Sequence, residues 1–223
     1  MRGRLRGLLV AAALLAAGGA TVPAGAQLGP QDPSPAAVEP ALAPAQPSRA
    51  LGRPWAGRLE HGVQLPVRGE GFESYDQILH RIPNRPWRRW ATQELVTVVE
   101  AVAASWAADH PDRTPLLVSD LSRPNGGWFG RQYGGLGHQS HQNGLDVDVM
   151  YPRKDGRRAA PRTPGDVDRR LAQELVDRFL EAGAVKLYVG PHLRLRGPRR
   201  IVVPLVHHDD HVHVRIPNPG SGR

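Results

Sequence analysis

Two short segments of this 223-residue chain alternate apolar and ionisable residues, and they constrain its fold more than any other feature. They read LDVDVMY at 145–151 and HVHVRI at 211–216. Successive side chains of a β-strand point to opposite faces of the sheet. As strands, both segments would present valines on one face and aspartates or histidines on the other. The pattern therefore predicts two strands with one core-facing side and one side rich in carboxylates and imidazoles.

Two other segments have the periodicity of amphipathic helices. The first spans 92–111, begins at the candidate N-cap Thr92 and stops at Pro111. The second spans 163–184 and ends at Gly183. Both apolar stripes are expected to face the core.

Short apolar segments at 116–120, 185–189 and 200–206 are the remaining strand candidates. Glycine- and proline-rich loops lie between the elements, and no internal repeat is present. This organisation predicts an α+β domain with a small, mainly antiparallel sheet, flanking helices and long loops.

The N-terminal segment 1–26 has the layout of a secretory signal peptide, with three early arginines, a short apolar run and Ala24-Gly25-Ala26 before Gln27. An uncleaved membrane anchor is the alternative. The apolar run is shorter than the ~20 residues that span a bilayer, so cleavage and no stable membrane insertion are expected. The protein is therefore predicted to be exported to the periplasm or cell-wall space.

Three further boundaries follow from composition. Segment 27–52 is rich in proline and alanine and poor in large apolar residues, which predicts a flexible linker. The folded domain is expected over 53–217 and a disordered tail over 218–223.

The chain contains no cysteine, which excludes disulfides, thiolate metal ligands and cysteine nucleophiles. Its formal charge of +8 becomes +5 when the three signal-peptide arginines are removed (8 − 3). Such a charge suits an anionic envelope polymer, but scattered arginines on a solvated surface explain it equally well. No basic motif interleaved with aromatic residues is present, so no nucleic-acid partner is expected.

The polar faces of the two alternating strands predict a metal site. A catalytic zinc site needs three nitrogen or oxygen ligands, an open position for water and a nearby base. His141, Asp148 and His213 can supply the ligands and His211 the neighbouring group. The alternative is that these histidines lie on the surface and that Asp146 or Asp148 caps a turn. The chain has no H-E-x-x-H, G-x-S-x-G or S-x-x-K motif, which argues against other hydrolase classes, serine-type enzymes included.

Several motifs occur in one order along the chain and together resemble a known family. They are SHQNGLDVD at 140–148, HHDDHVHVRI at 207–216, GVQLPVRGEGF at 62–72, RIPNRPW at 81–87 and VSDLSRPNGG at 118–127. They resemble the penicillin-insensitive murein endopeptidases, zinc enzymes of the group that includes D-Ala-D-Ala carboxypeptidases and dipeptidases. The resemblance covers about 60–217 and implies a Hedgehog/DD-peptidase-like fold.

The same resemblance implies an activity, a cofactor and a substrate. The activity is hydrolysis of D-Ala–diaminopimelate cross-links in peptidoglycan, the cofactor is Zn²⁺, and the partner is the cross-linked peptide stem.

Roles for individual residues also follow from the resemblance. His141 and Asp148 match the family's metal pair, and His213 matches the second histidine of its H-x-H motif, a ligand. His211 matches the first histidine of that motif, the catalytic base. Asp146 stands where the related carboxypeptidases have a small residue, which favours the endopeptidase branch.

Three more positions match family residues with less defined roles. His138 matches a histidine close enough to contact the metal or a second ion, and His208 one that faces the cleft and steadies the oxyanion or the substrate. Both can instead merely support the ligands. Arg123 matches an arginine that binds a substrate carboxylate, with a surface salt bridge as the alternative. His207 matches no family residue and is expected in a turn.

Two other functions are alternatives to the endopeptidase hypothesis. A D,D-carboxypeptidase or dipeptidase would use the same zinc site. A non-catalytic peptidoglycan-binding module would have lost a ligand or the base, and the chain keeps all of them.

Overall fold

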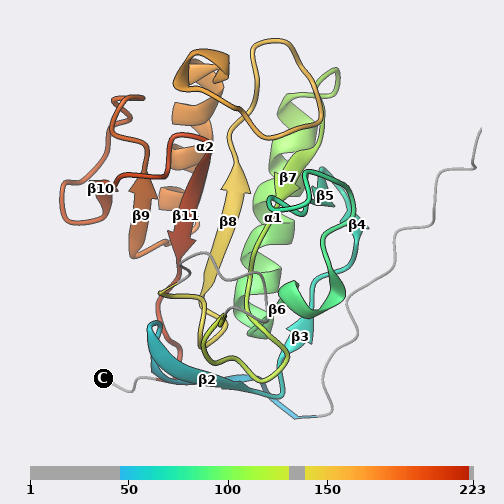
Figure 1. Ribbon diagram of the computed structural model, residues 1–223, viewed down its shortest axis with the longest axis vertical. Helices are drawn as coiled ribbons and strands as arrows, with labels where there is room; N and C mark the ends of the chain where they lie inside the picture. Colours follow the sequence, from blue (N-terminus) through green and yellow to red (C-terminus); the bar gives the residue numbers. More distant parts are fainter. Residues whose placement is uncertain (1–45, 131–138, 221–223) are drawn as a thin grey trace, which may run out of the picture. The chain divides into compact units, whose positions relative to one another are not determined.

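The computed structural model describes residues 46–130 and 139–220, which form an α+β fold built on a seven-stranded sheet (Figure 1). The strand order is β10-β9-β11-β8-β7-β5-β4. Only the β9–β10 and β5–β7 pairs are parallel, so the predicted mainly antiparallel sheet is confirmed. The strands are β4 (Arg68–Gly69), β5 (Phe72–Ser74), β7 (Leu116–Val118), β8 (Asp146–Met150), β9 (Lys186–Val189), β10 (Val202–Pro204) and β11 (His211–Arg215).

Two smaller strand pairs complete the β-structure. An antiparallel hairpin joins β1 (Arg49–Arg53) to β2 (Ala56–Glu60), and β3 (Val63–Gln64) pairs with β6 (Trp90–Ala91). The predicted linker, 27–52, therefore ends too late, because β1 already pairs with β2 and its Ala50 belongs to the core.

The first predicted helix is confirmed with its boundaries. Helix α1 (Gln93–Asp109) begins after Thr92, whose hydroxyl oxygen accepts a hydrogen bond from the backbone N–H of Leu95. This side-chain cap satisfies one of the amide groups that have no partner in the first turn.

The second predicted helix begins later than expected. Helix α2 (Arg169–Glu181) is capped by Asp168, and a separate 3₁₀ turn, η3 (Pro164–Asp166), precedes it. Another 3₁₀ turn, η1, spans Pro86–Arg88. Gly183 follows α2 with a φ of 85°, a left-handed conformation that glycine adopts without steric cost.

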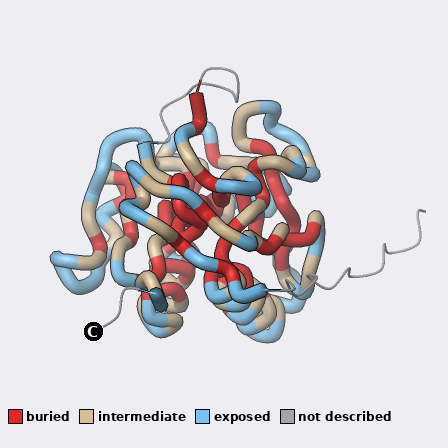
Figure 2. The backbone as a smooth tube through the Cα atoms, turned by 90° about the horizontal axis from the view of Figure 1, so that it is seen from below, coloured by how far each residue is buried: buried red, intermediate tan, exposed pale blue. Residues whose placement is uncertain are grey.

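The main core lies between the two helices and the valine side of the sheet. Both helices lie on the same side of the sheet, behind it in the view of Figure 1, and buried backbone fills the middle of the fold in Figure 2. The sheet contributes Val147 and Val149 from β8 and Val212 and Val214 from β11, all at most 1% exposed. The predicted division of these strands into two faces is therefore confirmed, and the aspartates and histidines point away from the helices.

The predicted signal peptide and most of the predicted linker lie outside the described residues. The predicted tail begins too early, because Asn218 donates a side-chain hydrogen bond to the carbonyl oxygen of Ala50 (3.2 Å). Within 46–130 and 139–220, none of the helices has the length and hydropathy needed to cross a membrane.

Candidate metal centre

The register between β8 and β11 brings the polar faces of the two strands together. In this antiparallel pair His213 lies opposite Asp148, and Arg215 lies opposite Asp146. Side chains at directly opposed positions have Cβ atoms ~5 Å apart, close enough for an imidazole and a carboxylate to touch. The loop before β8 adds His141, whose ring stacks edge-on against that of His213, with 4.6 Å between the centroids.

Three ligand-type atoms of this cluster form a small triangle. His141 Nε2 lies 3.3 Å from Asp148 Oδ1, His213 Nδ1 lies 3.0 Å from the same oxygen, and the two nitrogens are 3.1 Å apart. All three side chains are at most 6% exposed. Ligands ~2.0–2.1 Å from a tetrahedral metal ion are ~3.3 Å from one another. The spacing and chemistry of His141, Asp148 and His213 therefore fit a divalent metal ion.

The charges of the cluster also favour a cation. Burial opposes ionisation of Asp148, but the neighbouring imidazoles of His141 and His211 outweigh this and hold its pKa well below the usual value. Burial likewise opposes the charged form of His213, yet its hydrogen bonds to Asp146 and Asp148 raise its pKa to about 9. Without a metal ion, a proton on His213 thus neutralises part of the buried negative charge. A metal ion bound to the same atoms would replace that proton.

His211 lies directly beside the triangle. Its Nδ1 is 2.7 Å from a carboxylate oxygen of Asp210, and its Nε2 is 3.7 Å from Asp148 Oδ1. Because a carboxylate only accepts hydrogen bonds, Nδ1 donates and the lone pair of the neutral ring is on Nε2. Burial disfavours its charged form, but Asp148 and Asp210 outweigh burial and raise the pKa of His211.

His208 forms the outer part of the cluster. Its ring centroid lies 4.8 Å from that of His211 and 6.1 Å from that of His213. Burial and the adjacent His211 lower its pKa. His207, by contrast, is exposed and has a φ of 65°, in agreement with the expected turn position.

A family model for the penicillin-insensitive murein endopeptidases matches residues 50–178, more than half of the chain. The chain belongs to this family. The match contains His141 and Asp148, and the segment with His211 and His213 follows it. Peptidoglycan is the substrate that membership of a murein endopeptidase family implies, and hydrolysis is the reaction. No curated protein matches the chain significantly.

The roles of two residues singled out by the resemblance to the murein endopeptidases, His138 and Arg123, stay predictions. His138 lies outside the described residues. Arg123 follows β7, is half-buried and donates from its guanidinium to the carbonyl oxygen of Trp128 (2.8 Å). Binding of a substrate carboxylate by Arg123 therefore stays a prediction.

The structure adds two carboxylates whose contacts the sequence did not predict. Asp210 orients His211, as described above, and Asp146 touches two of the three candidate ligands, His141 and His213. The alternation in 145–151 placed Asp146 on the same face as Asp148. Its partners depend on the strand register, which the sequence alone did not give.

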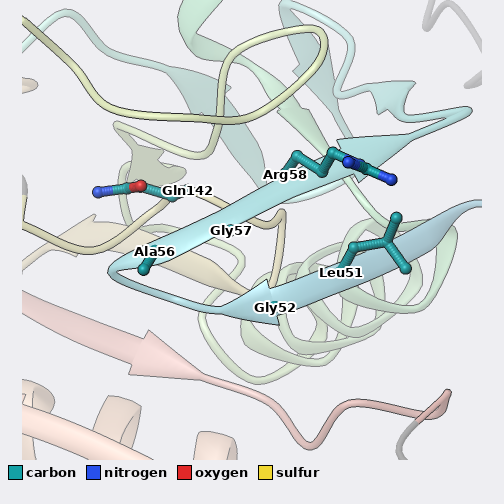
Figure 3. Close-up of a pocket in the computed structure, with 6 residues that line it drawn as sticks. All are labelled: Leu51, Gly52, Ala56, Gly57, Arg58 and Gln142. Carbon is teal, nitrogen blue, oxygen red and sulfur yellow. The ribbon is translucent and has the colours of Figure 1, made fainter.

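An open depression of about 590 Å³ lies over the β1–β2 hairpin (Figure 3). Its lining residues are Leu51, Gly52, Ala56, Gly57, Arg58 and Gln142. Gln142 links it to the loop of His141, through the bond from its backbone N–H to the carbonyl oxygen of Pro54 (2.9 Å). None of the candidate ligands lines this depression, so we place the chemistry at the His–Asp cluster instead.

Proposed function

We propose that this protein is a zinc-dependent murein endopeptidase that hydrolyses the D-Ala–diaminopimelate cross-link of peptidoglycan. The observation that carries the proposal is the buried triangle of His141, Asp148 and His213, with edges of 3.0–3.3 Å, in a chain of this family. His211, fixed by Asp210 at the edge of the triangle, supplies a group for proton transfer.

Zinc suits this donor set because two imidazoles and one carboxylate are typical ligands of catalytic zinc sites. His141 Nε2, Asp148 and His213 Nδ1 are the groups that would hold it. When bound, zinc acts as a Lewis acid and lowers the pKa of a coordinated water to about 7.

We assign His211 as the general base and acid of the reaction. Its Nδ1–H bond to Asp210 fixes the tautomer and leaves the Nε2 lone pair directed at the cluster. A positioned imidazole can take a proton from the attacking water and deliver it to the departing amine. Buried Asp148 nearby favours the protonated ring that exists between these two transfers.

His208 is better suited to accept a hydrogen bond than to stabilise an oxyanion. Its Nδ1 lies 2.9 Å from the carbonyl oxygen of Val206, so Nδ1 donates and Nε2 of the neutral ring accepts. Its lowered pKa favours that neutral ring. We therefore propose that His208 binds an N–H group of the peptide stem or of the leaving amine.

Insensitivity to penicillin follows from the same assignment. Penicillin inactivates enzymes by acylating a serine nucleophile, and the sequence lacks the S-x-x-K arrangement that activates one. The residues of the cluster are histidines and aspartates, and none of them forms a stable acyl-enzyme with the drug.

The second candidate function is a D,D-carboxypeptidase or dipeptidase with the same site. The family match favours the endopeptidase. A non-catalytic binding module is disfavoured because His141, Asp148, His211 and His213 converge in one buried cluster. Burying three histidines and an aspartate together without a chemical role would cost folding free energy.

The decisive experiment is digestion of purified muropeptides with identification of the products by mass. Cross-linked dimers should give monomers, with or without penicillin, and a chelator should abolish the reaction. Release of only terminal D-Ala from uncross-linked pentapeptides would assign the protein to the carboxypeptidases. Inhibition by penicillin would contradict the metal-dependent mechanism.

We also propose that the protein acts in the periplasm or cell-wall space after removal of residues 1–26. The basic start, short apolar run and Ala-Gly-Ala site support this, as does the location of murein outside the cytoplasmic membrane. N-terminal sequencing of exported protein should begin at or near Gln27. Recovery of intact Met1 from a membrane fraction would contradict it.

A further inference from the structure

Asp146 is fully buried and makes three hydrogen bonds around the metal centre without being one of its ligands. Its Oδ1 accepts from His213 Nε2 (3.0 Å) and from Arg215 Nε (2.6 Å). Its Oδ2 accepts from the backbone N–H of His141 (3.2 Å). One carboxylate thus contacts both candidate histidine ligands, at atoms other than those that face Asp148.

We propose that Asp146, anchored by Arg215, is a positioning residue that orients both histidine ligands of the metal centre. The inference rests on the proposed metal site and extends it to residues that touch neither metal nor substrate.

The bond to His213 selects a tautomer. Because the carboxylate of Asp146 accepts from Nε2–H, the lone pair of the neutral ring is on Nδ1. Nδ1 is the atom that lies 3.0 Å from Asp148 Oδ1 and 3.1 Å from His141 Nε2. Metal-binding histidines usually donate their other ring N–H to such a partner, which fixes the ring and raises its basicity.

The bond to His141 supports an unfavourable backbone conformation. His141 has a φ of 63°, in the left-handed region that side chains with a Cβ rarely adopt. Such conformations persist only where surrounding contacts hold them. Asp146 Oδ2 holds the N–H of His141, and the next residue, Gln142, is held by Pro54 of the hairpin.

The bond from Arg215 pairs the buried carboxylate of Asp146 with a cation. Arg215 lies opposite Asp146 in the β8–β11 register, and its side chain is only 13% exposed. The ring of Trp55 at the tip of the β1–β2 hairpin lies 5.9 Å from the guanidinium carbon of Arg215. A contiguous series of contacts therefore runs from Trp55 through Arg215 and Asp146 to His213.

Ser140 is the competing partner of His213, since its hydroxyl lies 3.4 Å from the same Nε2. This contact is longer than the bond to Asp146 and involves a neutral group, so it is expected to be weaker. A variant at Ser140 therefore separates the two possibilities.

The test measures zinc affinity of the full chain by competition with a chromogenic chelator, without substrate. Asp146→Asn should weaken binding by ~10–100-fold, the usual cost of losing such a partner. Arg215→Gln should act in the same direction, toward the lower end of that range. Ser140→Ala should stay within about twofold of the wild type, because the stronger partner remains.

Asp76→Asn is the matched control for the cost of disturbing a buried ion pair. Asp76 is also fully buried and also accepts from an arginine Nε at 2.6 Å, that of Arg85. Its other partners are the backbone N–H groups of Ile78 and Leu79. This variant should lose stability but keep its zinc affinity.

Proton NMR detects an effect on the His213 ring that a loss of stability alone would not produce. In zinc-loaded protein the Nε2 proton of His213 should resonate downfield, as expected for a hydrogen bond to a carboxylate, and Asp146→Asn should move it upfield. Asp76→Asn should leave it in place. The chemical shift would also reveal a changed hydrogen bond at His213 if Asp146→Asn still binds zinc but with altered geometry.

Three results would overturn the inference. They are unchanged zinc affinity in both Asp146→Asn and Arg215→Gln, an equal loss in Asp76→Asn, and a large loss in Ser140→Ala alone. If Asp146→Asn does not fold, Arg215→Gln carries the test. Wild-type protein that binds no zinc would instead contradict the proposed function, so the two failures are distinguishable.

Discussion

At the scale of single residues, the proposed metal site depends most directly on Asp148. Its carboxylate lies within 3.3 Å of the ligand nitrogens of both His141 and His213. Asp148→Ala should remove the only carboxylate of the ligand set, and the purified variant should contain much less zinc than the wild type. Elemental analysis after dialysis measures this directly. Equal zinc in the two proteins would exclude Asp148 from the ligands.

His211→Ala should separate metal binding from catalysis. His211 lies 3.7 Å from Asp148 but outside the ligand triangle, so the variant should keep its zinc. It should lose about 10²–10⁴-fold in rate, the usual contribution of a general acid–base group. His207→Asn is the control, because exposed His207 sits in a left-handed turn that asparagine tolerates. Normal turnover of His211→Ala would assign proton transfer to another group.

The sequence singled out three candidate ligands that the structure brings together, but not the carboxylates that contact the candidate histidines. Alternation along the two strands and the ordered family motifs were enough to select His141, Asp148 and His213. The roles of Asp146 and Asp210 follow from side-chain rotamers and from contacts such as that of Asp146 with Arg215, 69 positions away along the chain. No local pattern specifies contacts of that range.

At the scale of secondary-structure elements, a polar network joins the C-terminal end of α1 to α2. Glu174 accepts hydrogen bonds from Arg178 (2.7 Å) on its own helix and from His110 (2.6 Å) at the end of α1. Arg178 also binds Asp109 (2.6 Å). Burial opposes ionisation of Glu174, but these bonds outweigh it and lower its pKa.

Glu174→Gln should therefore reduce stability at neutral pH but not in acid. A carboxyl whose pKa is lower in the folded than in the unfolded state stabilises the fold above its ordinary pKa, and this contribution is lost as the pH falls through the lowered value. The expected loss at pH 7 is about 0.5–1 kcal/mol, since the pair is partly exposed. Denaturant unfolding of both proteins across the acid range measures it.

The free energies of unfolding of the wild type and of Glu174→Gln should become equal in acid. Exposed Glu181 on the same helix provides the control, and Glu181→Gln should follow the wild type at every pH. If the free energy of unfolding of Glu174→Gln differed from that of the wild type by the same amount at every pH, the ionisation of Glu174 would contribute nothing to stability.

The elements that the sequence predicted are those with long apolar or alternating patterns. All five predicted strands and both helices are present. Strands β1 to β6 were not predicted because several have only two or three residues, and the β1–β2 hairpin is largely exposed on both faces. Their pairing depends on tertiary contacts, which override weak local preferences.

At the scale of the whole molecule, zinc should stabilise the fold, because its ligands come from distant parts of the chain. A ligand present at about 1,000 times its Kd stabilises the native state by about 4 kcal/mol. For a domain of this size that corresponds to roughly 10 °C in Tm. Calorimetry before and after chelation should show this difference, whereas Asp148→Ala should melt at the same temperature in both conditions.

The direct opposition of Asp148 and His213 in the β8–β11 pair has a consequence for how the two strands must align. Displacing one strand by a single residue would turn its histidines toward the helices, because side chains alternate between faces. Displacing it by two would leave the faces correct but move the two groups ~7 Å apart along the strands, too far to share an ion. A two-residue shift in one direction would instead place His213 opposite Asp146 and His211 opposite Asp148. The set of His141, Asp148 and His213 therefore forms in only one alignment of the two strands.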